Sequence, residues 1–174
     1  HCSDDEDELL KKLKKFFNAY DFLIGWYSNS FDYPLILARS QLYGQNFKYF
    51  KRRAGDLMPL IDKFNNIRVI MSTAGLRDFS LDSVGKAFLG EEKLKFEDST
   101  YDRRYGGTIT KMFNERQDLL RDYNLQDCRI VRGLNKKFQV MDTLAILSEL
   151  SGAPMLDIAG SIGKAVEFCM LRYI

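Results

Sequence analysis

The feature that most constrains the fold is the stretch GWYSNSFDYPLIL with its flanks, where an apolar run, a polar turn and a helical pattern follow one another. The apolar run within DFLIGWY, residues 21–27, predicts a buried strand, and the turn Ser28-Asn29-Ser30 ends it. Pro34 stands in the first turn of an expected helix, and Gly44 marks its stop. A strand followed by a helix indicates an α/β arrangement. Asp32 lies at the junction, where it is either a helix cap or a metal ligand.

Residues 3–20 carry the pattern of an amphipathic helix. Ser3 and Glu6 have the spacing of a capping box, and acidic residues fill the expected first turn. Apolar residues then repeat at helical spacing as far as Tyr20. We therefore expect a helix before the strand at residues 21–27.

The middle of the chain mixes strand and helix signals. Residues 46–64 combine a strand with a short helix, and residues 66–71 indicate another strand. Residues 80–90 predict a helix that Ser80 caps and Gly90 stops.

The second half of the chain changes character. Residues 91–110 are charged, aromatic and glycine-containing, which predicts a loop. From about Met112 the pattern is almost wholly helical, with one break at Gly152 and Pro154. The sequence therefore predicts α/β structure first and helices afterwards.

The composition narrows the class of protein. With 174 residues, of which 45% are hydrophobic and 13% aromatic, the chain predicts one folded domain, residues 1–174. Its net charge of +2 neither requires nor excludes nucleic acid. No apolar run approaches the roughly 20 residues of a membrane span, and the three scattered cysteines indicate reduced thiols. We expect a protein without a membrane partner, located in the cytoplasm, or in the nucleus if its source is eukaryotic.

The only histidine is His1, at the very end of the chain, which excludes histidine-dependent catalytic and metal sites. Carboxylates and tyrosines must therefore carry any acid–base or metal chemistry. Tyr123 and Asp127 are four residues apart on a predicted helix and therefore share a face. A carboxylate there can hold a divalent ion, and a phenol can hold the water that attacks. Taken alone, each residue also has an ordinary structural interpretation, as a solvated helix acid and as a tyrosine at the edge of the core.

Together these features resemble the 3′–5′ proofreading exonuclease domain of family B DNA polymerases. LIGWYSNSFDYPLILAR resembles its second exonuclease motif, in which a strand leads to a Phe-Asp that starts a helix, and YNLQD resembles the third, Tyr-x-x-x-Asp. The two aspartates are 95 residues apart. DLMPLI and FSLDSVGKAFLGEEK resemble the linking segments, and LSELSGAPMLDIAGSIGKAVEFCMLR resembles the passage into the palm domain. The resemblance covers nearly the whole chain in the family's order.

The resemblance implies a ribonuclease-H-like α/β fold with a helical C-terminal half that connects towards the palm from about residue 138. It implies four acidic residues that hold two Mg²⁺ or Mn²⁺ ions for hydrolysis of the 3′-terminal phosphodiester of DNA. Asp32 and Asp127 would be metal ligands and Tyr123 would orient water, as in the tyrosine variant of the DEDD exonucleases. The implied partners are a single-stranded DNA 3′ end or primer–template DNA, and the palm and N-terminal regions of a parent polymerase.

The sequence departs from the family at two places. The first motif, Asp-x-Glu on the first strand, is matched in letters by Asp4-Asp5-Glu6, but this triplet opens a helix, so a capping role is expected. The fold is therefore expected to lack its first strands and two of its four metal ligands. The family's substrate-contacting asparagine, five residues before the second-motif aspartate, is Tyr27 here. Tyr27, Asn29 and Phe31 are the candidates for contact with substrate.

Two hypotheses for the function follow. One is the proofreading exonuclease; the other is a catalytically inactive, structural module that contacts DNA. Two basic aromatic segments also have two interpretations. FKYFKRR, residues 47–53, is either a surface for single-stranded DNA or a solvated strand edge, and YDRRYGG, residues 101–107, is a loop that could touch DNA.

Overall fold

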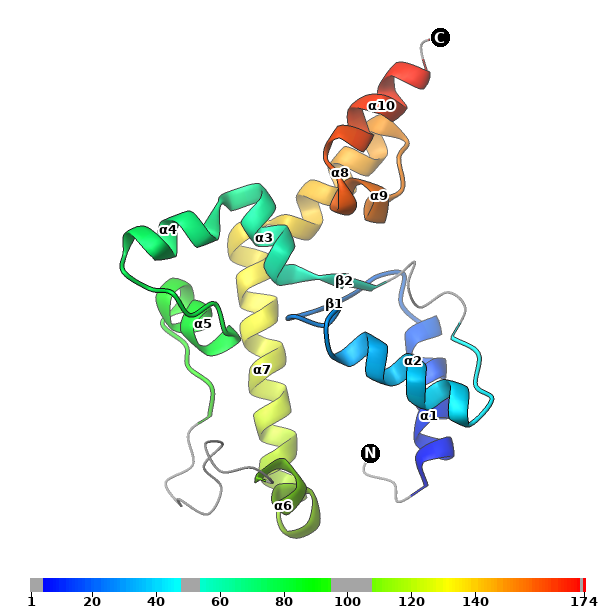
Figure 1. Ribbon diagram of the computed structural model, residues 1–174, viewed down its shortest axis with the longest axis vertical. Coiled ribbons are helices and arrows are strands. Elements are labelled where there is room, and N and C mark those ends of the chain that lie inside the picture. Colours follow the sequence, from blue (N-terminus) through cyan, green and yellow to red (C-terminus); the bar gives the residue numbers. More distant parts are fainter. Residues whose placement is uncertain (1–4, 48–53, 95–107, 173) are drawn as a thin grey trace.

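The computed structural model describes residues 5–47, 54–94, 108–172 and 174 (Figure 1). Its elements, in chain order, are α1 (Glu6–Asn18), β1 (Leu23–Gly25), α2 (Asp32–Leu42), β2 (Ala54–Asp56), α3 (Leu57–Asn65), α4 (Ile67–Thr73), α5 (Leu81–Leu89), α6 (Thr108–Glu115), α7 (Gln117–Phe138), α8 (Val140–Ser151), α9 (Met155–Gly160) and α10 (Gly163–Leu171). Helices dominate the described residues, and the first half also holds a small sheet. The predicted α/β class with a helical second half is confirmed at this level, and a ribonuclease-H-like fold stays a prediction.

The sheet in the described residues consists of β1 and β2, which run parallel with Leu23 opposite Ala54 and Gly25 opposite Asp56. The carboxyl ends of both strands therefore meet at one edge. Each strand is three residues long, and β1 is only half-buried. The prediction of a buried strand over residues 21–27 is too long and overstates the burial, because β1 has a single partner strand among the described residues.

The main core forms around α7, which lies between α5, α3 and α8 in Figure 1. Its fully buried side chains come from all four of these helices and include Ile61, Val84, Ile130, Leu134 and Leu144. Gly85 of α5 permits the closest approach, since a Cβ added there would lie 2.7 Å from Cγ2 of Ile130. Tight packing of α5 on α7 fixes the relative position of two walls of the cavity described below.

The outer region, α1 with α2, has a much smaller apolar cluster, in which Leu10 and Phe47 are the buried residues. Polar contacts supplement it. Arg39 of α2 forms an ion pair with Glu6 of α1, and the Tyr43 hydroxyl donates a hydrogen bond to the same carboxylate at 3.0 Å. The Arg39 guanidinium holds the pKa of Glu6 below its usual value.

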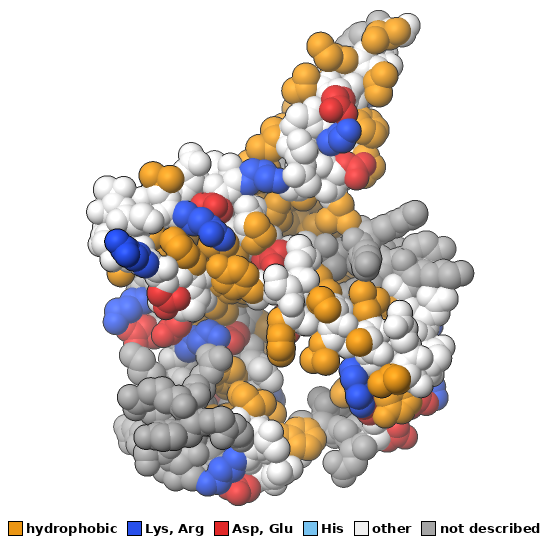
Figure 2. Space-filling view, viewed as in Figure 1, with side chains coloured by type: hydrophobic (Ala, Val, Ile, Leu, Met, Phe, Trp, Pro, Cys, Tyr) orange, Lys and Arg blue, Asp and Glu red, His pale blue; other side chains and the backbone are white. Residues whose placement is uncertain are grey.

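The C-terminal helices α8, α9 and α10 form an arm that extends away from the rest of the chain (Figure 1). The predicted break is confirmed, because Gly152 adopts φ 75° at the end of α8 and Pro154 precedes α9. Hydrophobic side chains gather on the surface of this arm (Figure 2), and Leu150 and Leu171 are each 69% exposed. Within the described ranges, no helix combines the length and apolar character needed to cross a bilayer.

The start of α1 differs from the capping-box prediction. Its N-cap is Asp5, whose carboxylate accepts hydrogen bonds from Asp7 N at 3.0 Å and Glu8 N at 3.2 Å. Glu6 is therefore the first helical residue rather than the third, and the predicted cap Ser3 lies outside the described residues. The capping interpretation of the DDE triplet is confirmed.

The strand predicted over residues 66–71 is wrong, because this segment is the helix α4. Asn66 adopts φ 50° and reverses the chain between α3 and α4. Ile67 and Met71, one helical turn apart, are buried, whereas Val69 between them is 64% exposed. The local run of β-branched residues favoured a strand. The helix instead buries Ile67 and Met71, which lie one turn apart on the same face.

The helix over residues 80–90 is confirmed as α5, with Ser80 as its cap and Gly90 at φ 71° after its end. Helical structure resumes at Thr108, earlier than the predicted start near Met112. A further interruption, at Gln139 with φ 51°, separates α7 from α8 and was not predicted.

The two basic aromatic segments fall largely outside the described residues. Of FKYFKRR only Phe47 is described, and it is buried. YDRRYGG, residues 101–107, lies wholly outside. The hypotheses for both segments stay open.

Candidate functional site

One cavity of about 940 Å³ brings together residues from four parts of the chain. Its walls are the end of β1 with the following loop and the start of α2, the segment that leads into α5, Lys93 beyond α5, and one face of α7. The side chains that could carry chemistry are Tyr27, Asp32, Asp78, Lys93, Asn124, Asp127, Cys128 and Arg132. Asp32 and Asp127, predicted from separate motifs, thus border the same cavity.

Asp32 is the first residue of α2 and is exposed. The N-cap is Phe31, whose side chain makes no capping hydrogen bond, so the alternative that Asp32 caps the helix is wrong. An acid in the first turn still interacts favourably with the helix dipole. The geometry leaves Asp32 on the cavity wall, where its carboxylate is accessible to a ligand.

Asp127 lies on α7, and its Oδ2 forms an ion pair of 2.8 Å with Lys93 Nζ. The same ammonium group donates to the Tyr123 hydroxyl at 3.3 Å and lies 5.4 Å from the centre of the Tyr123 ring. Lys93 has a side chain only 16% exposed, against 26% for Asp127. Partial burial strengthens this charge-assisted contact relative to a surface ion pair.

Tyr123 and Asp127 share one face of α7, as their spacing predicted. Tyr123 is only 5% exposed and is absent from the residues that line the cavity. Lys93, which does line the cavity, contacts both side chains. The tyrosine therefore lies behind Asp127, in contact with the cavity wall through Lys93.

The segment that carries Lys93 is fixed between two helices. Lys93 N donates to Asp82 Oδ1 of α5 at 2.6 Å, and Gln126 Nε2 of α7 donates to the Glu92 carbonyl at 3.3 Å. Lys86 adds an ion pair with Glu92. These contacts hold the ammonium group of Lys93 against Asp127.

Carboxylate oxygens are the ligands that Mg²⁺ and Mn²⁺ prefer. Asp127 Oδ1 is buried and has no hydrogen-bond partner among the described residues. A bound cation would satisfy this oxygen. Yet no group of three or more His, Cys, Asp or Glu side chains suited to a metal occurs in the ranges that the structure describes. These residues fit part of a metal site, and they do not by themselves fit the two-ion set with four acids.

The loop after β1 is held by Asp56, at the end of β2. This carboxylate is 4% exposed and accepts hydrogen bonds from Tyr27 N at 2.9 Å and Asn29 N at 3.3 Å. Burial raises the pKa of Asp56, the backbone N–H groups of Asn29, Tyr27 and Met58 oppose this rise, and the nearby Asp32 charge adds to it. Asp56 therefore interacts with the charge of Asp32, and its hydrogen bonds hold the loop that precedes Asp32.

The three predicted substrate-contact residues separate in the structure. Tyr27 lines the cavity with Asp32 and Asp127 and is 39% exposed, in a left-handed conformation with φ 55°. Asn29 lines a different cavity, of about 570 Å³, on the side of α3 and α9. Phe31 lines neither of these two cavities and is 69% exposed. Of the three, only Tyr27 is placed beside the two acids.

Glu6, the acid of the Asp-x-Glu letters, does not reach the cavity. Its carboxylate contacts Arg39 and Tyr43 at the junction of α1 and α2. This triplet therefore adds no ligand to the candidate site.

Sequence reasoning missed Lys93 and Asp56. A lysine in a charged segment gives no pattern that marks it, because its role depends on the packing of α5 against α7. For Asp56 a signal existed: an aspartate directly before an apolar helical run is typical of an N-cap, and its side chain does accept from Met58 N.

Comparison with known proteins shows similarity to DNA polymerases, because the chain's curated relatives are family B DNA polymerases. "DNA polymerase 1" of Pyrococcus abyssi is 28% identical over 183 residues, which cover 96% of this chain and 22% of that protein. "DNA polymerase II" of Escherichia coli (strain K12) is 27% identical over 177 residues, covering 89% of this chain and 22% of that protein. No protein-family profile matches the chain. The resemblance to family B DNA polymerases is confirmed, and the chain spans about a fifth of the length of these two relatives.

Proposed function

We propose that the chain is the 3′–5′ exonuclease segment of a DNA polymerase, which removes the terminal nucleotide from a DNA 3′ end. The observation that carries the proposal is that Asp32 and Asp127, 95 residues apart in sequence, border one cavity in a relative of DNA polymerases. A volume of about 940 Å³ suits a ligand of nucleotide size.

Side chains on the cavity wall and directly behind it have separate roles in this proposal. Asp127 is held through Oδ2 by Lys93, which leaves the buried Oδ1, without a hydrogen-bond partner among the described residues, as the oxygen that a bound cation would satisfy. Because Lys93 also contacts the Tyr123 hydroxyl, its ammonium group fixes the relation between the aspartate and the tyrosine that would orient water. Lys93 and Arg132 supply positive charge for phosphate groups, and Tyr27 supplies a ring on which a base can stack.

We propose Mg²⁺ or Mn²⁺ as cofactor, with Asp32 and Asp127 among its ligands and the remaining acids contributed from outside the described residues. Such an ion stabilises charge on the phosphate and activates water. The exposed apolar side chains on the arm, including Leu150 and Leu171, are consistent with packing against a further domain such as a palm.

The test is a nuclease assay with 5′-labelled single-stranded DNA in Mg²⁺ or Mn²⁺. We expect stepwise shortening from the 3′ end, reduced at least about a hundredfold in Asp32→Asn and Asp127→Asn, since each substitution removes a charge directed at the reacting phosphate. Asp122→Asn is the matched control. Asp122 lies on α7 near Asp127 but is exposed and does not line the cavity, so this variant retains the wild-type rate.

A second candidate is a non-catalytic module that contacts DNA, which is favoured by the finding that the described residues hold no cluster of three potential metal ligands. Retained DNA binding without shortening, with no difference between wild type and the two aspartate variants, would establish this candidate and reject the exonuclease.

A further inference from the structure

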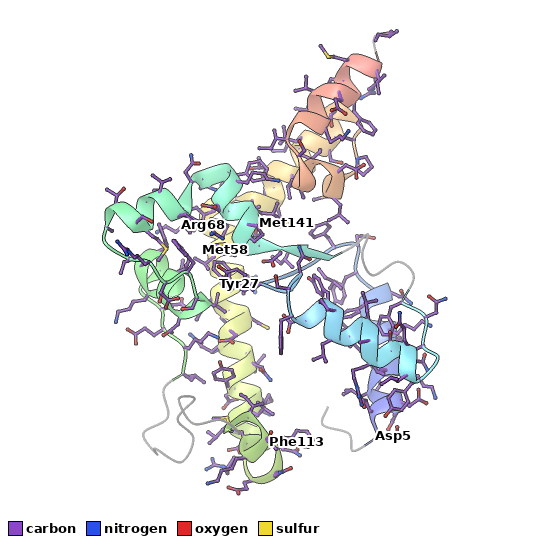
Figure 3. All side chains as sticks on the ribbon, viewed as in Figure 1. Asp5, Tyr27, Met58, Arg68, Phe113 and Met141 are labelled. Carbon is purple, nitrogen blue, oxygen red and sulfur yellow. The ribbon has the colours of Figure 1, made fainter. Side chains whose placement is uncertain are left out.

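Asp56 occupies a central place beneath the loop that carries the second motif. It ends β2 directly opposite Gly25, the last residue of β1. Its Oδ1 accepts from Tyr27 N at 2.9 Å and Met58 N at 3.3 Å, and its Oδ2 accepts from Asn29 N at 3.3 Å. Tyr27 and Met58 lie close together where the sheet meets α3 (Figure 3). One buried carboxylate thus joins the loop, the sheet and the start of α3.

Among the described residues, the other contacts of the loop shape it without joining the N–H groups of Tyr27 and Asn29 to the sheet. Tyr27 adopts a left-handed conformation, which a bulky residue keeps only where surrounding contacts enforce it. Ser28 is 2% exposed and packs against Gly25, where an added Cβ would lie 1.7 Å from its Oγ. The Ser28 carbonyl in turn accepts from Tyr33 N at 2.9 Å. The bonds to Asp56 are the contacts by which these peptides are fixed to the sheet.

The fixed loop determines where Asp32 lies. Asp32 is separated from Asn29 by two residues, and the Ser28–Tyr33 bond closes the turn around it. A second link runs from the Tyr33 hydroxyl to the Gly55 carbonyl at 3.1 Å, next to Asp56. A movement of residues 27–29 would therefore move the start of α2 and its carboxylate relative to Asp127.

We propose that Asp56 is a positioning residue of the exonuclease site, which fixes the second-motif loop and thereby sets the place of Asp32 and Tyr27 on the cavity wall. The inference rests on the proposed function, and its structural half can be tested separately. Asp56 does not line this cavity, so it acts through the loop rather than on substrate.

Asn is the informative replacement because it keeps the shape of the side chain. An amide oxygen can accept from both Tyr27 N and Met58 N, but its nitrogen cannot accept from Asn29 N. Asp56→Asn should therefore release one peptide of the loop selectively. Asp62→Asn is the matched control on α3, the helix that Asp56 caps. Asp62 accepts a hydrogen bond from Arg68 N at 2.9 Å, at the opposite end of α3 and away from the cavity.

The experiment measures amide hydrogen exchange at Tyr27 and Asn29, affinity for a 5′-labelled single-stranded oligonucleotide, and single-turnover 3′ shortening in Mg²⁺. We expect Asp56→Asn to speed exchange at Asn29 about tenfold and to slow shortening by a similar factor, as loss of a buried bond to a charged group implies. Asp62→Asn leaves all three unchanged.

The outcomes separate the two proposals. Unchanged exchange in Asp56→Asn overturns the anchoring role, and faster exchange with an unchanged rate in an active wild type overturns the positioning role. If the wild type does not shorten DNA, the proposed function fails. The affinity of Asp56→Asn for the oligonucleotide then tests the positioning role. Faster amide exchange at Asn29 without weaker binding rejects the inference. Should Asp56→Asn not fold, Tyr33→Phe tests the same junction, with a several-fold loss expected from removal of the bond to Gly55.

Discussion

Asp32 and Asp127, the two predicted metal ligands at the cavity, come from regions that are stabilised in different ways. Asp127 lies on α7, whose inner face is buried in the main core with Ile130 and Leu134 at 0% exposure. Asp32 follows a short, half-buried strand and precedes a helix whose neighbouring apolar cluster has two buried residues. One half of the site is fixed by apolar packing, and the other depends largely on polar contacts.

The difference indicates how the site can move. Regions with few buried apolar contacts open at a lower free energy than the core. We therefore expect α7 to act as the fixed wall, while the loop and α2 provide the adjustable one. Contacts that cross between the regions, such as the Trp26 Nε1–H bond to the Phe79 carbonyl at 3.3 Å, then limit the adjustment.

The largest expected change in the free energy of unfolding comes from substitutions in the main core. Leu134→Ala on α7 should lower the free energy of unfolding by about 3 kcal/mol, because it leaves a cavity at a fully buried position. Leu10→Ala in the small outer cluster should cost about 2 kcal/mol or less, since neighbouring side chains there can collapse more easily. Urea denaturation followed by circular dichroism measures both.

An exposed leucine supplies the control for these two variants. Leu150→Ala, at a position that is 69% exposed, should change the free energy of unfolding by less than about 0.5 kcal/mol. Equal losses for Leu10→Ala and Leu134→Ala would remove the distinction between the two regions.

A smaller effect is expected at the contact between the core and the cavity. Lys93→Met should lower the free energy of unfolding by about 1–2 kcal/mol, because it leaves the partly buried Asp127 carboxylate without its cation. The double variant Lys93→Met/Asp127→Asn should recover part of that loss. Urea denaturation of the two single variants and the double variant gives the coupling energy between the side chains. Additive losses would show that the ion pair contributes nothing and that Lys93 is held by the rest of its segment.

Local sequence signals predicted those parts of the fold that depend on local structure. Pro34 and Gly44 marked the limits of α2, and Ser80 and Gly90 marked those of α5. The four-residue spacing of Tyr123 and Asp127 placed them on one helical face, because periodicity is a property of the helix itself. In the same way, α4 was missed because its short run of β-branched residues carries a misleading local preference.

The contacts that complete the candidate site could not be predicted in this way. Lys93 and Asp127 are 34 residues apart, and Asp56 and Tyr27 are 29 apart, so each pair forms only after several elements have packed. The convergence of Asp32 and Asp127 on one cavity was accessible only through the family resemblance, which carries information about tertiary structure that composition and periodicity lack.

The smallest expected effect on stability concerns the polar contacts between α1 and α2. It appears as a dependence of the free energy of unfolding on pH. The pKa of Glu6 is lowered chiefly by its hydrogen bond from Arg39, so the native state binds fewer protons at this group than the unfolded state does. The stability that Glu6 contributes is therefore fully present above its ordinary pKa of 4.5 and is lost as the pH falls through the lower, folded-state value. Glu6→Gln should remove this component and flatten the loss of stability on acidification.

The measurement is a set of urea midpoints between pH 6 and pH 3, with Glu149→Gln as the control for loss of one exposed glutamate. Amide exchange in α1 and α7 at the same pH values, expressed as protection factors relative to the intrinsic rate at each pH, assigns the change to a region: acid should lower the protection of α1 in the wild type before it lowers that of α7. If Glu6→Gln follows the wild-type pH dependence, the Arg39 contact does not hold the outer region. The half of the site that carries Asp32 would then depend on Asp56 and the small apolar cluster alone.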